Sequence, residues 1–216
     1  MKCPLCSTES DSFLPFGNPP RKNAMCPSCK SLERHRFSGK YISSQPWLTK
    51  NSRILHFAPE ECISLLLKNI SGNNYVSADI KKGRAMLAED ITKLSMPDMV
   101  FDFIYCSHVM EHIVDDHKAF SEIHRVLAHN GKVLFMVPIN GDSTKEDPSV
   151  LTDEDRLRVY GQHDHVRIYG KMDFADRMKK VGFDVEIIQS SSVMSKEEMN
   201  FFGIKNTCVF VGTKLK

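Results

Sequence analysis

The sequence predicts an α/β protein with a mostly parallel sheet, preceded by a small metal-binding segment. From residue 53 onward, short apolar runs alternate with helical patterns, which is typical of βα units. Four of the seven cysteines fall into two C-x-x-C pairs within the first thirty residues. A chain of 216 residues, 41% hydrophobic and 26% charged, has room for one such domain and a small appendage.

The N-terminal cysteines have the spacing of a metal knuckle pair, C-x2-C-x19-C-x2-C, formed by Cys3, Cys6, Cys26 and Cys29. Four thiolates at this spacing suit a closed tetrahedral zinc site. The segment between the pairs is poor in apolar residues, so the ion would supply the missing folding energy. We therefore expect a structural zinc ribbon over residues 1–30. A site filled by four cysteines has no open position for chemistry.

Basic residues surround the second cysteine pair, namely Arg21, Lys22, Lys30, Arg34, Arg36 and Lys40. They could form the phosphate-contacting edge of a nucleic-acid-binding ribbon. They could equally be the solvated face of a helical linker over residues 31–52. The formal net charge of +2 does not imply a polyanionic partner, and we favour the linker.

The remaining elements follow from periodicity and turn residues. The helix at 115–131 opens with two aspartates and closes at Gly131, and its apolar residues recur at helical spacing. The predicted strands lie at 53–58, 74–80, 85–90, 101–109, 132–139, 184–189 and 207–213, and the other predicted helices at 60–70 and 172–183.

Polar residues follow the strands where an open parallel sheet binds its ligands, at the carboxyl ends. Asp79 follows the second strand and could accept both hydroxyls of a ribose, whereas Asp90 follows the third and could accept an adenine amino proton. Each alone reads as a turn or capping residue. The pair in this order favours a nucleoside.

Several segments resemble the class I S-adenosylmethionine-dependent methyltransferases (type 11-like), closely over residues 53–140. They are "RILHFAPE", "SADI", "AEDIT" and above all "FDFIYCSHVMEHIVDDHKAFSEIHRVLAHNGKVLFMVPI". With "CPSCKSLERHR" and "YGQHDHVRIYG", the chain is similar to a bacterial subgroup that carries an N-terminal zinc ribbon. The resemblance implies a Rossmann-like methyltransferase fold with a mostly parallel seven-stranded sheet over 53–216 and S-adenosylmethionine as cofactor. It implies that Asp79 binds the ribose, Asp90 the adenine, and Ser107 and His108 the methionine end.

The chain departs from the family in the turn after the first strand. The family has an acidic residue and a glycine-rich turn there, whereas this chain has His56, Phe57, Ala58, Pro59 and Glu60. Glycines let the backbone approach the cofactor closely, so an altered path or weakened binding is expected. We still place His56, Ala58 and Glu60 at the cofactor, with Glu60 as partner of its amino group.

The segment "HVMEH" also matches the H-x-x-E-H pattern of zinc peptidases, through His108, Glu111 and His112. That site requires all three residues on one continuous helix. His108 instead ends an apolar strand, so a peptidase is only a remote alternative.

Residues 139–171 form a connection far longer than the usual two to six or so residues, and we expect a substrate lid. His163, Asp164, His165 and Arg167 cluster in it beside two tyrosines. We expect either histidine to be a general base oriented by Asp164, with Arg167 holding an anionic group. There are two alternatives to this acid–base role. The cluster could be a hydrogen-bonded surface network, or His163, Asp164 and His165 could form a second metal site.

The predicted function is methyl transfer to an oxygen or nitrogen of a small-molecule acceptor, such as a sugar or glycan precursor. The alternatives are an RNA methyltransferase or nucleic-acid-binding protein that uses the ribbon, and a cofactor-binding protein that has lost catalysis. No apolar run approaches the roughly 18 to 20 residues of a spanning helix, and no signal-peptide core is visible. We therefore expect a cytoplasmic protein without a membrane partner.

Overall fold

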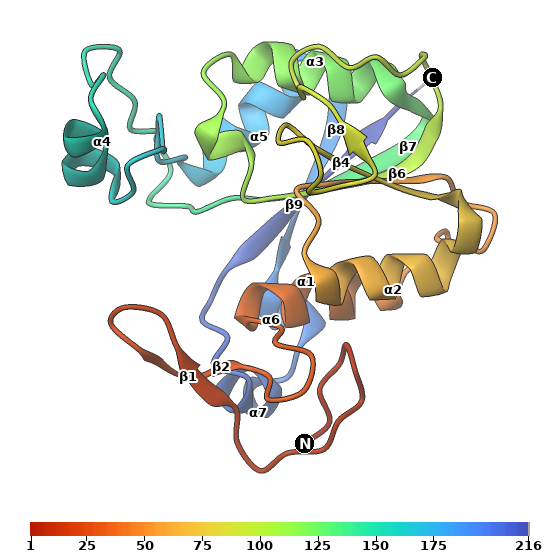
Figure 1. Cartoon of the computed structure of the whole chain (residues 1–216), viewed down its shortest axis with the longest axis vertical. Helices are drawn as coiled ribbons and strands as arrows, with labels where there is room; N and C mark the ends of the chain where they lie inside the picture. Colours follow the sequence, from red (N-terminus) through yellow and green to blue (C-terminus); the bar gives the residue numbers. More distant parts are fainter. Residues whose placement is uncertain (216) are drawn as a thin grey trace. The chain divides into compact units, whose positions relative to one another are not determined.

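The computed structural model describes residues 1–215, and their contacts divide into two compact units (Figure 1). The ribbon unit comprises residues 1–52, 59–75 and 188–209. The sheet unit comprises residues 53–58 and 76–187 and the chain from Phe210 on. Residues 59–75 and 188–209, which the sequence placed in the methyltransferase domain, thus belong to the same compact unit as the N-terminal segment.

The ribbon unit combines a hairpin with short helices. Strands β1 (Leu14–Phe16) and β2 (Arg21–Met25) pair antiparallel. The helices are α1 (Glu33–Ser43), which lies in the predicted linker, α2 (Glu61–Ser71), η1 (Gly72–Asn74), α6 (Ser190–Val193) and α7 (Lys196–Phe201). Arg36 has no exposed surface and donates to the carbonyls of Ser31, Asn23, Ala24 and Phe202. This one guanidinium therefore links the second cysteine loop, the hairpin and the end of α7.

Within residues 1–215 the large sheet has seven strands in the order β5-β4-β3-β6-β7-β9-β8. The pairs β3–β6, β4–β5 and β6–β7 are parallel and β7–β9 is antiparallel, which confirms the predicted mostly parallel sheet. The strands are β3 (Ile54–Phe57), β4 (Tyr75–Asp79), β5 (Leu87–Ala88), β6 (Phe101–Ser107), β7 (Leu127–Met136), β8 (Phe183–Gln189) and β9 (Cys208–Lys214). Their bounds lie close to the predicted ones except for β7, which the sequence predicts at 132–139 and which begins already at Leu127.

Helices α3 (Asp116–Val126) and α5 (Lys171–Lys180) lie side by side on one face of the sheet (Figure 1). Phe120 and Phe174, one from each helix, pack edge to face at 5.4 Å between ring centroids, and both contact Phe135 of β7. Helix α3 ends at Val126, before the predicted Gly131, because Leu127 already pairs with Phe101 in the sheet.

The long connection over 139–171 is ordered and contains α4 (Asp153–Tyr160). Thr152 caps this helix by accepting from the Asp155 amide at 3.1 Å, and Gly161 ends it at a φ of 80°. Lys145 and Ile168 exchange backbone hydrogen bonds at the base of the connection. Among residues 1–215, every helix is too short or too polar to span a bilayer.

Candidate functional site

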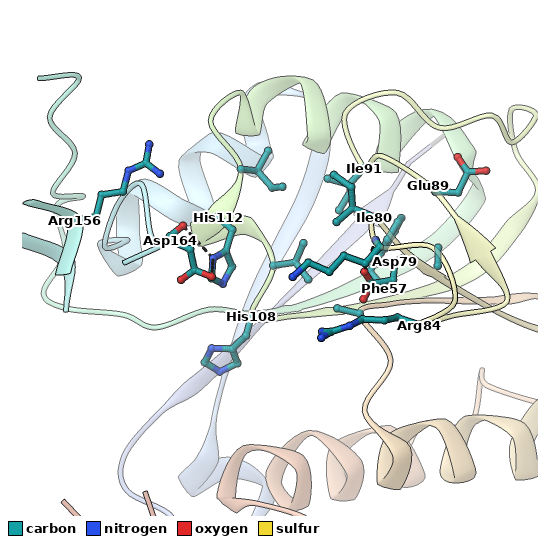
Figure 2. A pocket seen from close by; sticks show the side chains of 15 residues that line it. Phe57, Asp79, Ile80, Arg84, Glu89, Ile91, His108, His112, Arg156 and Asp164 are labelled. Carbon is teal, nitrogen blue, oxygen red and sulfur yellow. Dashed lines mark hydrogen bonds and ion pairs between the residues drawn. The ribbon is translucent and has the colours of Figure 1, made fainter. Parts of the chain in front are cut away.

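A cavity of about 440 Å³ opens at the carboxyl ends of β3, β4 and β6 (Figure 2). This is where an open parallel sheet is expected to bind a ligand. Residues of four segments line it: Phe57 and Ala58; Ala78, Asp79, Ile80, Lys81, Arg84, Glu89 and Ile91; His108, Val109, His112 and Ile113; and Arg156 and Asp164 of the 139–171 connection.

Asp79 ends β4 and presents its carboxylate to the cavity (Figure 2). Its Oδ1 accepts a hydrogen bond from the Lys81 amide at 2.7 Å. The turn role and the ligand role that the sequence set against each other are therefore compatible, because a carboxylate has further acceptor positions.

The turn after β3 keeps a glycine-like conformation although it has no glycine. Ala58 has a φ of 46°, in the left-handed region that residues with a Cβ avoid. Its amide donates to the Ala78 carbonyl at 2.9 Å, which fixes the turn against β4. Alanine therefore takes a conformation that favours glycine, at a cost in strain.

Two other predicted cofactor residues have different surroundings from Asp79. Asp90 accepts from the Thr92 amide and hydroxyl, both at 2.8 Å, and these bonds lower the pKa of its carboxyl. The cavity wall beside it is formed by Glu89 and Ile91. His56 is fully buried, and its ring packs edge to face on Tyr105.

Glu60 and Ser107 are two further residues that the sequence placed at the cofactor. Glu60 precedes α2 in the ribbon unit and lies 3.4 Å from Nε2 of His35. Ser107 ends β6 with 2% of its surface exposed, and its Oγ finds no hydrogen-bond partner among residues 1–215. A buried hydroxyl of this kind fits a site that a polar ligand completes.

The H-x-x-E-H residues do not share a helix. His108 has a φ of 54°, and only a 3-10 turn, η2 (Met110–His112), follows it. His108 Nδ1 instead lies 3.0 Å from Glu111 Oε1. The helical geometry of a zinc peptidase is therefore missing from this segment.

The titratable residues of the 139–171 connection divide between the surface and the interior. His163 and Asp164 are exposed, whereas His165 is only 7% exposed and burial lowers the pKa of its imidazole. Nδ1 of His112 lies 3.2 Å from the Asp164 carbonyl and 3.4 Å from its Oδ2. His112, which follows β6, therefore meets Asp164 of the 139–171 connection beside the cavity (Figure 2).

Arg167 is buried, and its guanidinium is already surrounded by acceptors. It donates to Glu146 Oε2 at 2.8 Å and to the carbonyls of Ile113 and Val114. Asp116, which accepts from Arg177 at 2.8 Å, lies 3.6 Å away. This ion network ties the lid to the segment that leads into α3.

The four N-terminal cysteines form one cluster, with all sulfurs within 4.8 Å of one another. Cys3 and Cys29, and likewise Cys6 and Cys26, are 3.8 Å apart at sulfur. Sulfurs at about 2.3 Å from a tetrahedral zinc ion lie about 3.8 Å apart, so the spacing fits zinc. The hydrogen bond from Cys29 is the main cause that lowers the pKa of Cys3 to about 4.

Three of the six basic residues of the proposed ribbon edge are engaged within the protein. Arg21 pairs with Glu33 at 2.7 Å, and Lys40 pairs with Glu198. Arg36 is buried and bound to backbone carbonyls. These positions offer little free charge to a phosphate backbone.

Sequence reasoning missed several residues of the cavity wall. Lys81 and Arg84 follow Asp79 by only a few residues, and the rule on strand ends could have included them. Arg156 lies on α4, whose charged sequence has no apolar periodicity to mark a cavity-facing side. The position of His112 beside Asp164 depends on the tertiary fold.

Comparisons with known proteins agree with this architecture. Residues 55–135 match the family model described as a methyltransferase domain, whereas no curated protein sequence matches the chain. The YcgJ protein of Bacillus subtilis has 18% identity and a TM-score of 0.57 over 84% of this chain and 99% of its own. A structure of the Haloferax volcanii Trm112 methyltransferase activator with a putative methyltransferase gives 11% identity and a TM-score of 0.62 over 85% and 92%.

A third solved structure contains a product of the cofactor. It is phosphoethanolamine N-methyltransferase 2 of Haemonchus contortus, in complex with phosphomonomethylethanolamine and S-adenosylhomocysteine. It has 16% identity and a TM-score of 0.57 over 84% of this chain and 53% of its own. At these identities the structures show a shared fold, and the family match adds the enzyme class. Residues 55–135 therefore form a methyltransferase domain, and the enzyme class that this match supports is S-adenosylmethionine-dependent methyltransferase.

Proposed function

We propose that the chain transfers the methyl group of S-adenosylmethionine to an oxygen or nitrogen of a small-molecule acceptor, such as a sugar or glycan precursor. One observation carries the proposal. A single cavity has Asp79 on one wall and His108, His112, Arg156 and Asp164 on another. A nucleoside would occupy the first part, and the reacting methyl group and the acceptor the second.

The cofactor contacts follow from this placement. The Asp79 carboxylate would accept the ribose hydroxyls, and Ile80 and Ile91 would give the adenine an apolar surface. The Ala58 backbone would face the methionine portion, and His108 would line its end. For Asp90, His56, Glu60 and Ser107, which do not line the cavity, a direct cofactor contact remains a prediction from the sequence.

Methyl transfer from a sulfonium is an in-line displacement for which the cofactor supplies the leaving group. The protein then mainly aligns the acceptor and excludes water. The 139–171 connection suits this role, because Arg156 and Asp164 bring it to the cavity wall. The acceptor must also lose a proton, for which His163 and His165 are the sequence-based candidates with Asp164 as the orienting group.

Arg167 supports the site in a different way from the anion-binding role expected from sequence. Its contacts with Glu146 and with the carbonyls of Ile113 and Val114 favour a positioning role. It would hold the lid against the segment that carries His112.

We further propose that Cys3, Cys6, Cys26 and Cys29 hold a structural zinc ion. The sulfur spacing supports this assignment, as does the small apolar content of the hairpin segment. With four protein ligands the ion has no role in the reaction itself.

Transfer of label from methyl-labelled S-adenosylmethionine tests the acceptor class. The protein is incubated with a panel of monosaccharides and nucleotide sugars in one arm and with total RNA in the other. We expect label in the small-molecule arm, and a dependence on Asp79 that Asp79→Ala reveals. Label that enters RNA alone, with sensitivity to moderate salt, would overturn the small-molecule assignment.

A further inference from the structure

A second cluster of metal-binding side chains lies in the sheet unit, at the edge of the proposed acceptor site. Ligand atoms of Glu111, His112 and His165 all lie within 4.8 Å of one another. Glu111 and His112 come from η2 after β6, and His165 comes from the lid. Two imidazoles and a carboxylate are a ligand set typical of divalent transition metals.

Glu111 is the strongest sign that this cluster needs a ligand. Its side chain is 1% exposed, and only Oε1 is engaged, 3.0 Å from His108 Nδ1. Within the described chain Oε2 is buried with no hydrogen-bond partner. Neither a lysine nor an arginine of residues 1–215 makes an ion pair with it, so this carboxylate lacks a permanent cation. A buried, half-satisfied carboxylate is costly unless a cation or donor completes it.

The backbone holds the two halves of the cluster together. The Val166 amide donates to the Glu111 carbonyl at 2.9 Å, directly beside His165. The rings of His112 and His165 pack edge to face, with centroids 4.8 Å apart. The side chains are therefore brought together by fixed main-chain contacts and not by a chance approach of mobile surface groups.

The cluster also has an open side. His112, His108 and Asp164 line the cavity (Figure 2), whereas Glu111 and His165 are buried. Three protein ligands with one side facing a cavity is the arrangement of catalytic metal sites, in contrast to the closed four-cysteine cluster.

We propose that Glu111, His112 and His165 bind a divalent transition-metal ion that holds and activates a hydroxyl group of the methyl acceptor. The binding site stands on the geometry alone, whereas the role of the ion rests on the proposed function. His108 and Asp164, next to the ligands, are positioned to hydrogen-bond the ligands or the bound hydroxyl.

The reaction then needs no separate protein base at His165. A bound cation favours ionisation of the acceptor hydroxyl, whose proton passes to water. The acceptor oxygen forms a bond to the methyl carbon as the carbon–sulfur bond breaks. The electron pair of that bond goes to sulfur, and the sulfonium becomes a neutral thioether. Acceptors with a second oxygen next to the reacting hydroxyl are the best substrates, because both oxygens can bind the ion.

The metal content of the full-length protein tests the site directly. After loading with Zn²⁺ and removal of excess, elemental analysis should find two ions per chain in the wild type. Glu111→Gln and His165→Ala should each reduce this to one, because the four-cysteine site remains. His117→Ala, which removes an exposed histidine outside the cluster, should keep two.

Cobalt(II) distinguishes the two sites in the same protein. A four-thiolate site gives intense sulfur-to-metal charge-transfer absorption, whereas a histidine–carboxylate site gives only weak visible bands. Glu111→Gln should remove the weak bands and leave the charge-transfer absorption. A single ion in the wild type, or weak bands that persist in both Glu111→Gln and His165→Ala, would overturn the proposal.

Binding of S-adenosylhomocysteine separates this proposal from the proposed function. Variants that keep their affinity for it are folded and have an intact cofactor site. If the wild type binds S-adenosylhomocysteine but holds one metal ion, the second site fails and the methyltransferase assignment stands. If it holds two ions but does not bind S-adenosylhomocysteine, the metal site stands and its catalytic role fails.

Discussion

The Val166 amide donates a hydrogen bond to the Glu111 carbonyl at 2.9 Å, and this bond joins the lid to the turn after β6. It brings His165 next to His112 and places Asp164 at the wall of the cavity. The lid is thus tied to the strand ends by its main chain, and the ion network of Arg167 reinforces the connection.

That ion network gives a prediction about stability. Asp116 accepts from the Tyr169 hydroxyl and from Arg177, both at 2.8 Å, and is 6% exposed. Asp116→Ala removes one of the two carboxylates that pair with Arg167 and Arg177, and it should lower the free energy of unfolding by about 1–3 kcal/mol. Urea unfolding of the wild type and the variant measures this difference in the free energy of unfolding. Asp176→Ala, which breaks an exposed pair with Lys179, should change it by less than about 0.5 kcal/mol. Equal losses would show that the network adds nothing beyond a surface pair.

The turn after β3 gives a second prediction. Ala58 has a φ of 46°, which costs an alanine about 1–2 kcal/mol relative to glycine. Ala58→Gly should therefore raise the free energy of unfolding by up to about 1 kcal/mol, after the flexibility of glycine is subtracted. Ala78→Gly, in the interior of β4, should lower it by about 1 kcal/mol or more. A loss of stability in both variants would contradict the strain assigned to Ala58.

Removal of the zinc ion should act locally on the ribbon. With chelator, amide hydrogen exchange over residues 1–30 should accelerate, because the ion replaces an apolar core there. Cys26→Ser should show the fast exchange with or without chelator. Cys208→Ser, which changes a buried cysteine outside the cluster, should keep the response of the wild type. Unchanged exchange in Cys26→Ser would mean that the cysteines do not organise this segment.

The pair of Arg53 and Asp102 predicts a pH dependence. Asp102 accepts from the guanidinium and the amide of Arg53, and this lowers the pKa of its carboxyl below the ordinary value of 3.8. Because the folded-state pKa is the lower one, the pair stabilises the protein above the unfolded pKa. Its contribution is lost as the pH falls through the folded value. The urea midpoint of Asp102→Asn should therefore lie below that of the wild type at pH 6, and the two should converge toward pH 3. A difference that stays constant over this range would rule out ionisation of Asp102 as its source.

Most strands of the large sheet could be predicted because each is a short apolar run between turn residues, whereas the hairpin strands β1 and β2 have no such run and were not predicted. The end of α3 could not, because Val126 and Leu127 are equally apolar and only the pairing of Leu127 with Phe101 decides where the strand begins. The same limit applies to the site. Asp79 follows from its position after a strand, whereas the cavity takes Ile91 in place of its neighbour Asp90.

The difference between the sequence-based prediction and the structure is larger for the residues around His165. The sequence marks His163, Asp164, His165 and Arg167 as one group, but burial separates the exposed pair from the buried pair. Arg167 meets Glu146 and Asp116, and His165 meets Glu111 and His112. These partners come from separate parts of the chain, and no local pattern joins them. Two residues of the "HVMEH" match, Glu111 and His112, belong to the proposed metal cluster, although the helical geometry of a peptidase is absent.

Binding of the cofactor product is the most direct test of the central claim. Isothermal titration of the zinc-loaded protein with S-adenosylhomocysteine should show one site per chain. Asp79→Ala should weaken binding at least about tenfold, since hydrogen bonds to a charged acceptor contribute about 1.5–3 kcal/mol each. Asp184→Ala, an exposed aspartate of β8, should bind as the wild type does. No binding by the wild type, or equal binding by Asp79→Ala, would contradict the assignment of the cavity to S-adenosylmethionine.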